Sequence, residues 1–108
     1  MSNTSPLDIP ALLRRIPLFS ELSEADIQLV ARYTRERQVA RGEVLFQRGD
    51  LPHGFYFVVS GQVKLAFTSP QGGEKVVDIV GQGHSFGEAI MFMEKPYMVY
   101  AQALVDSQ

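Results

Sequence analysis

Gly87 and Glu88 are adjacent residues whose types could bind a ligand directly. The composition from Glu88 to Met93 favours a short helix, and the first backbone N–H groups of a helix are free to bind an anion or a hydroxyl group. Glycine lets a ligand approach the main chain closely, and a carboxylate accepts hydrogen bonds from hydroxyl groups. The same carboxylate is also well placed as a simple helix-cap or helix-dipole group. The pair alone leaves both interpretations open.

Soft apolar side chains follow this pair. Three of the four methionines, Met91, Met93 and Met98, lie within eight residues, together with Phe92, Tyr97 and Tyr100. Methionine commonly fills gaps in protein cores, so core packing is the favoured role for each of them. We therefore expect an apolar filling beside Gly87 and Glu88.

The two histidines, His53 and His84, are the remaining ligand candidates, and both lie in expected loops. They lack the helical spacing of a preassembled metal pair, and no serine stands in a strand-to-helix elbow. The chain has no cysteine, which excludes disulfides, cysteine-bound zinc and iron–sulfur clusters. The sequence predicts neither a metal site nor an enzyme.

Glycine spacing indicates the elements that must position these residues. All nine glycines fall between Gly42 and Gly87, and turn signals recur there every seven to twelve residues. The segments between them are rich in β-branched and aromatic residues, which favours short antiparallel strands in a sandwich or barrel. We expect strands over residues 43–47, 55–60, 63–68, 75–80 and 97–105, a hairpin turn at 69–73, and one inserted helix at 88–93.

The first 41 residues contain no glycine and are typical of helices. One short helix is expected over residues 7–15, and a second over 23–34, where Ser23 and Asp26 resemble a capping box. At 108 residues the chain is one domain at most. We divide it into an N-terminal arm with helices packing on the rest, residues 1–36, and a β unit, residues 37–108.

Charge and hydropathy exclude further classes. The net charge is −2 and all seven arginines precede residue 49, which gives no concentrated basic face for a nucleic acid. No apolar run approaches 18 residues, and the N-terminus has no signal-peptide pattern. We expect a cytoplasmic protein without a membrane partner.

Three separated segments resemble the cyclic-nucleotide-binding effector domain of the Crp/Fnr transcription regulators. They are Leu18-Phe19 before the second helix, the stretch from Gly42 to Lys64, and Phe86-Gly87-Glu88-Ala89. The resemblance implies a mainly β fold, an antiparallel double-stranded β-helix or jelly roll. It has short N-terminal helices and one inserted helix, and this chain would be truncated before the dimerisation helix and the DNA-binding helix-turn-helix.

This resemblance also implies a function and partners. The chain is expected to be a sensor of a small-molecule effector, with homodimer and DNA contacts made through the absent C-terminal part. RNA polymerase is a further candidate partner. Two alternatives remain open: a haem-based nitric oxide sensor of nitrate respiration genes, and a cyclic-nucleotide-binding regulatory domain of a kinase or channel. The expected ligand-binding positions are Gly87, Glu88, Tyr97 and Met98, and the ligand of the parent protein would be a cyclic nucleotide or haem.

The family places an arginine for the cyclic phosphate ten or eleven residues after the glycine, where this chain has Tyr97 and Met98. Because a charge-assisted hydrogen bond is missing, we expect no ordinary response to cyclic AMP. Lys95 is a weaker candidate cation, since a solvated loop lysine is its simpler interpretation. The stretch from Glu88 to Pro96 resembles the dissimilatory nitrate respiration regulators, a Crp/Fnr branch that senses nitric oxide through haem.

Overall fold

The computed structural model describes residues 7–108, without the side chains of Ala89 and Phe92. The chain divides into two units, Met1–Glu36 and Arg37–Gln108. Within residues 7–108, no helix has the length and apolar character needed to cross a membrane. The packing of the N-terminal helices on the β unit stays a prediction.

Three short helices form the first unit, and their ends explain where they begin. Helix α1 spans Ile9–Arg14, a 3-10 turn spans Pro17–Phe19, and α2 spans Glu24–Arg32. Asp8 and Ser23 cap α1 and α2, because their side chains accept hydrogen bonds from the N–H groups of Ala11 and Asp26. The predicted helices and the Ser23 cap are therefore confirmed.

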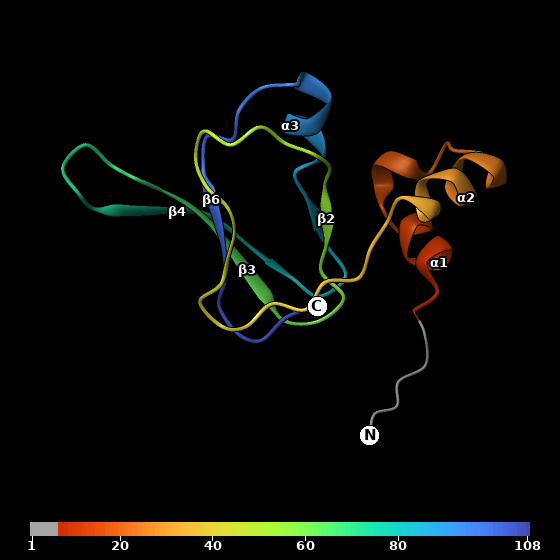
Figure 1. The fold of residues 1–108 in the computed structure, drawn as a ribbon, viewed down its shortest axis with the longest axis horizontal. Helices are drawn as coiled ribbons and strands as arrows, with labels where there is room; N and C mark the ends of the chain where they lie inside the picture. The colour runs from red at the N-terminus through yellow and green to blue at the C-terminus, as the bar shows by residue number, and fades with distance from the viewer. Residues whose placement is uncertain (1–6) are drawn as a thin grey trace. The chain divides into compact units, whose positions relative to one another are not determined.

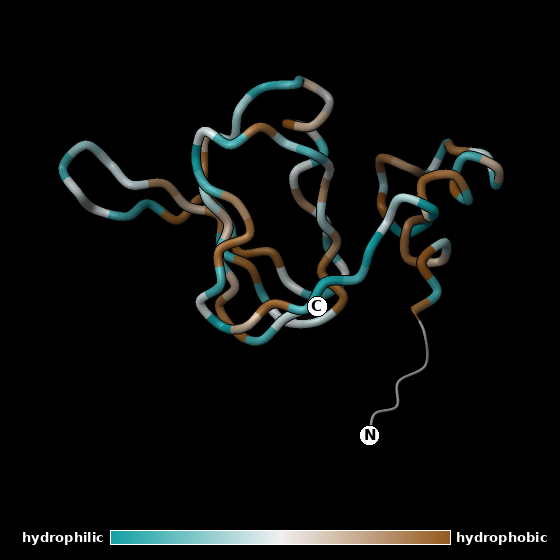
Figure 2. The backbone as a smooth tube through the Cα atoms, viewed as in Figure 1, coloured by the Kyte–Doolittle hydropathy of each residue, from teal (hydrophilic) through white to brown (hydrophobic). Residues whose placement is uncertain are grey.

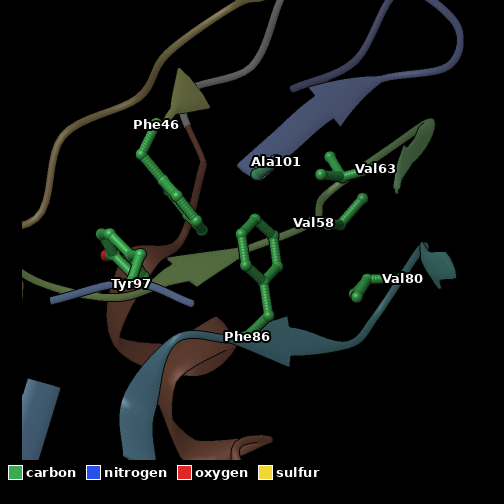
Figure 3. Packing of buried hydrophobic residues seen from close by; sticks show 7 residues of the cluster. All are labelled: Phe46, Val58, Val63, Val80, Phe86, Tyr97 and Ala101. Carbon is green, nitrogen blue, oxygen red and sulfur yellow. The ribbon is translucent and has the colours of Figure 1, made fainter. Parts of the chain in front are cut away.

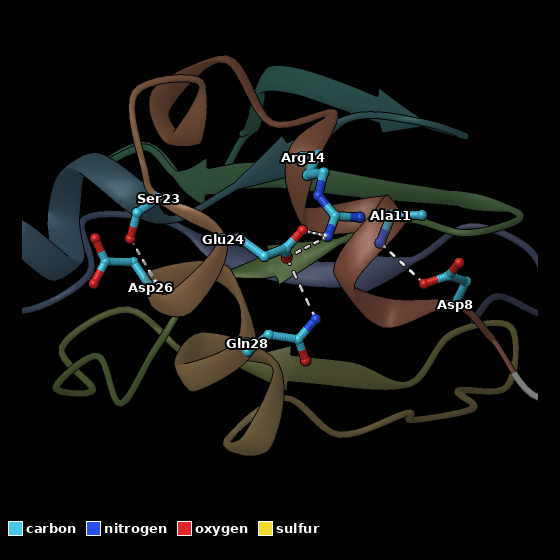
Figure 4. A network of polar contacts seen from close by, with 7 residues as sticks. All are labelled: Asp8, Ala11, Arg14, Ser23, Glu24, Asp26 and Gln28. Carbon is cyan, nitrogen blue, oxygen red and sulfur yellow. Dashed lines mark hydrogen bonds and ion pairs between the residues drawn. The ribbon is translucent and has the colours of Figure 1, made fainter.

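An ion pair links the two α-helices of this unit (Figure 4). The Arg14 guanidinium donates to the Glu24 carboxylate at 2.5 Å, and Gln28 donates to the same carboxylate at 3.4 Å. The Arg14 hydrogen bond lowers the pKa of Glu24, with a smaller contribution from Gln28. Both partners are exposed, so the pair mainly fixes geometry and adds little stability.

The second unit is built from antiparallel strands (Figure 1). One sheet has the order β1-β6-β3-β4, and a smaller one pairs β2 with β5. The strands are β1 (Val44–Phe46), β2 (Tyr56–Phe57), β3 (Gln62–Thr68), β4 (Glu74–Gly81), β5 (Ser85–Phe86) and β6 (Tyr100–Ala103), and helix α3 spans Glu88–Met93. The predicted antiparallel β fold with one inserted helix is confirmed.

The predicted strand ranges need three corrections. The segment expected at 55–60 shortens to β2, because the N–H groups of Val58 and Val59 donate instead to the carbonyls of His84 and Gln108. The segment expected at 97–105 shortens to β6. Strand β5 was not expected. The hairpin turn at residues 69–73 is present, with Ser69 and Gly73 hydrogen-bonded through their main chains.

The two ends of this unit meet. Val39 and Ser107 exchange two main-chain hydrogen bonds of 2.9 Å, and Ser60 and Gln108 exchange two more. Gly61 has φ 95°, and a Cβ there would lie 2.8 Å from the Cα of Ser107. Only glycine fits this crossing, so Gly61 lets the final segment close over the start of β3.

A cluster of buried side chains fills the unit. It draws on β1, β3, β4, β5 and β6 and on the loops beside them (Figure 3). Its buried members are Phe46, Val58, Val63, Val80, Phe86, Tyr97 and Ala101. Of the residues expected to bind a ligand, Tyr97 is a member of this cluster, Gly87 and Glu88 follow its member Phe86, and Met98 follows Tyr97.

Candidate ligand site

Gly87 lies between strand β5 and helix α3, and Glu88 is the first residue of α3. Gly87 is the N-terminal cap residue of α3. Its φ is 92°, a backbone conformation that residues other than glycine rarely adopt. A Cβ at this position would also lie 3.6 Å from the Cα of Phe55. The chain therefore reverses at Gly87 and places the first turn of α3 directly after the buried Phe86.

Ser85 and Glu88 form the polar contact of this reversal. The Ser85 hydroxyl donates a hydrogen bond of 2.5 Å to Oε2 of Glu88, and both residues are half-buried. That length is typical of a hydroxyl donating to a charged carboxylate. Helix α3 has six residues and ends where Glu94 turns to a positive φ of 54°, so its dipole is weak. The chemistry of this end lies in the carboxylate.

Tyr97 points into the core. Its side chain is 5% exposed, and its ring stacks on Phe46 with 3.6 Å between centroids and 9° between planes. Its main chain is held on both sides, because Tyr97 N–H donates to the Asp50 carbonyl at 2.9 Å and Gly49 N–H donates to the Tyr97 carbonyl at 2.8 Å. These bonds direct the phenol toward the aromatic rings.

The aromatic residues continue from Tyr97 toward Phe86 and Tyr56. The ring centroid of Phe46 lies 6.3 Å from that of Phe86 and 5.9 Å from that of Tyr56. The Tyr56 ring stacks on Phe86 with 5.1 Å between centroids. Burial raises the pKa of the Tyr97 phenol, and nearby Tyr56 and Asp50 raise it further. The side chain at position 97 is therefore an uncharged phenol at neutral pH.

Met98 faces the other way. It is 73% exposed, in keeping with the alternation of neighbouring residues in extended chain, and Met93 is exposed as well. The expectation that methionines fill the space beside Glu88 is wrong for these two. Aromatic rings occupy the core there, because Phe46, Tyr56 and Phe86 come from strands that the sequence pattern did not connect with this segment.

A family model described as the cyclic nucleotide-binding domain matches residues 36–108, more than half of the chain. The chain belongs to the cyclic nucleotide-binding domain family. Gly87, Glu88, Tyr97 and Met98 all lie within the matched region.

Relatives of three kinds share this domain. The cyclic AMP receptor protein of Thermus thermophilus is 33% identical over 85% of this chain and 43% of its own length. A cAMP-dependent protein kinase regulatory subunit of Mycosarcoma maydis is 32% identical over 78% of this chain and 16% of its own length. Potassium channels occur among the relatives too. The chain thus spans less than half the length of these relatives.

Among solved structures, the sensor domain of the transcriptional regulator DNR from Pseudomonas aeruginosa has a TM-score of 0.82 and 34% identity. The matched region covers 90% of this chain and 65% of that sensor domain. The predicted resemblance to Crp/Fnr effector domains is confirmed by these likenesses, and so is the jelly-roll fold.

Sequence reasoning missed Ser85 as a partner of Glu88. A signal was present, because Ser85-Phe86-Gly87-Glu88 has the Ser-x-x-Glu spacing of a capping box. In the structure Gly87 takes the cap position instead, and the serine hydroxyl bonds to the glutamate side chain. The spacing correctly indicated a contact but not which atoms would form it.

Proposed function

We propose that this cyclic nucleotide-binding domain is the ligand-sensing effector domain of a Crp/Fnr-type transcription regulator, and that it does not respond to cyclic AMP in the usual way. The observation that carries the second part is that neither Tyr97 nor Met98, the two positions where the family resemblance implies an arginine, offers a cation: the Tyr97 ring is buried and stacked on Phe46, and Met98 is exposed. A neutral phenol cannot replace the charge-assisted hydrogen bond of a guanidinium to a phosphate.

The nearby cations offer no evident substitute. Arg48 and Lys95 are exposed, and neither takes part in the ion pairs formed among the described residues. An anion that moves from water into a half-buried site loses solvation free energy, and without a cationic partner no interaction compensates for that loss. Cyclic AMP should therefore bind weakly even where its base and sugar find room.

Haem is the second ligand class that the family resemblance raises. Haem iron takes an axial side-chain ligand such as histidine. His53 and His84 are both exposed and lie outside the buried aromatic cluster. Within residues 7–108, no three His, Asp or Glu side chains lie close enough together to bind a metal ion. The described side chains do not fit a buried haem with a histidine ligand, so no step of the proposed function passes through haem.

A regulatory domain of a kinase or a channel is the alternative function, supported by the kinase subunit and channel relatives. DNA binding separates the two classes. The intact dimer of a Crp/Fnr regulator should bind a two-fold DNA site through a helix-turn-helix, whereas a kinase or channel regulator should not. In either case the ligand acts by binding two conformational states with different affinities.

The test of the proposed function is calorimetric titration of cyclic AMP into the intact protein. We expect no submicromolar binding. Tyr97→Arg and Met98→Arg each supply a guanidinium, and the variant whose cation reaches the phosphate should bind about tenfold more tightly or better. Because Tyr97 is buried, Tyr97→Arg endangers folding, and the exposed Met98→Arg keeps the test decisive.

Tyr97→Phe and Met98→Gln are the matched neutral controls and should leave the affinity unchanged. Submicromolar binding of cyclic AMP by the unmodified protein would show that another group supplies the charge, and the proposal would be wrong. If both arginine variants fold and neither gains affinity, the missing cation is not the defect.

A further inference from the structure

Ser107 and Gln108 form a closing segment that bonds to two other parts of the β unit. On one side, Val39 and Ser107 exchange main-chain hydrogen bonds of 2.9 Å in both directions. On the other side, the Gln108 N–H donates to the Ser60 carbonyl at 3.0 Å, and the Gln108 carbonyl accepts the Val59 N–H at 2.8 Å. The closing segment therefore lies between two stretches of chain as a strand lies between its neighbours in a sheet.

Val58 extends these contacts toward strand β5. The Val58 N–H donates to the His84 carbonyl at 2.9 Å, and the Val58 carbonyl accepts the Gly83 N–H at 2.8 Å. His84 directly precedes β5, which leads into α3 and the predicted ligand residues. A series of main-chain hydrogen bonds thus runs from the start of β5 through Val58 and Val59 to the closing segment.

The other end of this series lies beside the boundary between the two units. The first unit ends at Glu36, and residues 34–38 belong to no helix or strand. Val39 is 6% exposed and is bridged to Ser107. The ion pair of Arg37 with Glu43 is exposed and adds little. The bridge to the closing segment is therefore what fixes the main chain where it enters the β unit.

The Ser107 side chain fastens the closing segment. This residue is 8% exposed, and its hydroxyl accepts the Gln62 N–H at 3.1 Å and donates to the Val105 carbonyl at 2.8 Å. Removing the hydroxyl leaves a part-buried N–H without this acceptor. The attachment of the closing segment should therefore depend strongly on this one side chain.

We propose that the closing segment couples β5 to the boundary between the units, because the bonds on its two sides open and close as one cooperative event. Both neighbours lose their hydrogen-bond partners together when two residues leave, and such a small segment opens more readily than the whole domain. The inference rests on the proposed function, since it adds a regulatory path to the same sensor. A ligand that favours one arrangement of β5 changes how often the segment is closed, and with it the freedom of the chain at Val39.

Amide hydrogen exchange of the intact protein tests this coupling with no ligand added. The N–H groups of Val39, Val59 and Gly83 are donors along the series and serve as probes. After correction for intrinsic rates, we expect the three to exchange at one common rate. That rate should be at least tenfold faster than for Ala66, which is fully buried in the central strand β3.

Two serine variants assign the coupling to the closing segment. Ser107→Ala should speed exchange at all three probes by about tenfold and leave Ala66 unchanged. Ser69→Ala is the matched control, because its hydroxyl also accepts a main-chain N–H, at 3.2 Å, but lies in the β3–β4 hairpin turn. Exchange at the three probes should not change in this variant.

Three results would overturn the coupling. In the unmodified protein, the corrected rates at the three probes would differ by more than tenfold. In Ser107→Ala, exchange would speed up at Val39 and Val59 but not at Gly83. In the third, Ala66 would change as much as the probes, which would mean that the closing segment opens only with the whole domain. None of these results bears on the proposed function, which stands or fails on the cyclic AMP titration.

Discussion

The β3–β4 hairpin and the aromatic core belong to the same unit and are built on the same antiparallel pairing, yet their apolar side chains have opposite fates. Phe46, Phe86 and Tyr97 are buried, whereas Val76, Val77 and Ile79 of β4 are about half exposed. In Figure 1 the hairpin reaches beyond the other strands of its unit. Strand β4 is an edge strand, and six of its eight residues are exposed.

Hydropathy alone does not predict this difference. Figure 2 shows the hairpin changing from hydrophilic and neutral at its tip to hydrophobic where its strands join the sheet. The pairing itself shows a protected edge: the register shifts between Leu65 and Ala66, and the Asp78 side chain accepts the Ile79 N–H. A bulge and a capped N–H hinder pairing with another strand. In the core, by contrast, the rings of Phe46, Phe86 and Tyr97 pack against one another and fix the positions of these side chains.

The first prediction compares one residue from each region by truncation. Phe46→Ala should lower the free energy of unfolding by about 3 to 5 kcal/mol, because it removes a ring that contacts Tyr56, Phe86 and Tyr97 and leaves a cavity. Val77→Ala on the exposed hairpin should cost less than about 1 kcal/mol. Urea unfolding of both variants measures the difference, and equal losses would contradict the division into ordered core and exposed hairpin.

The second prediction compares two glycines that share a positive φ. Gly61→Ala should cost about 2 to 4 kcal/mol, because the strained conformation is joined by a clash with the Ser107 main chain. Gly72→Ala at the hairpin tip has φ 87° and open space, so only the conformational strain of about 1 to 2 kcal/mol applies. Unfolding curves of the two variants give the comparison, and a smaller loss at Gly61 would show that Ser107 can move aside.

The sequence predicted the elements better than it predicted the site. Glycine spacing located β3, β4 and the turn between them because each strand there is long enough for a β pattern. Strand β5 has two residues, Ser85 and Phe86, and no periodicity can be detected over so short a run. Its existence depends on pairing with Tyr56 and Phe57, about thirty residues earlier in the chain.

The orientation of the site residues depends on the same long-range contacts. Tyr97 and Met98 were both candidates in the sequence, because the family resemblance places an arginine ten or eleven residues after the glycine. The two main-chain hydrogen bonds to Gly49 and Asp50 turn the side chain of Tyr97 inward. The aromatic composition of the core followed from the strands that meet there, which explains why the methionine expectation failed at Met93 and Met98.

The last prediction concerns how the free energy of unfolding depends on pH, and its expected effect is the smallest. It tests the core through Tyr97. Burial raises the pKa of Tyr97 above its usual value of 10.0, so the folded domain keeps the phenol protonated at a pH where the unfolded chain ionises it. The stabilisation is complete below pH 10 and is lost as the pH rises above it.

Tyr97→Phe keeps the ring on Phe46 but has no proton to lose, so its stability should fall less steeply between pH 9 and 11. Urea unfolding of both proteins across that range measures the two slopes, and parallel curves would mean that the phenol reaches water. The charged residues of β4, Glu74, Lys75 and Asp78, are all exposed, so the slope difference reports on the core and not on the hairpin.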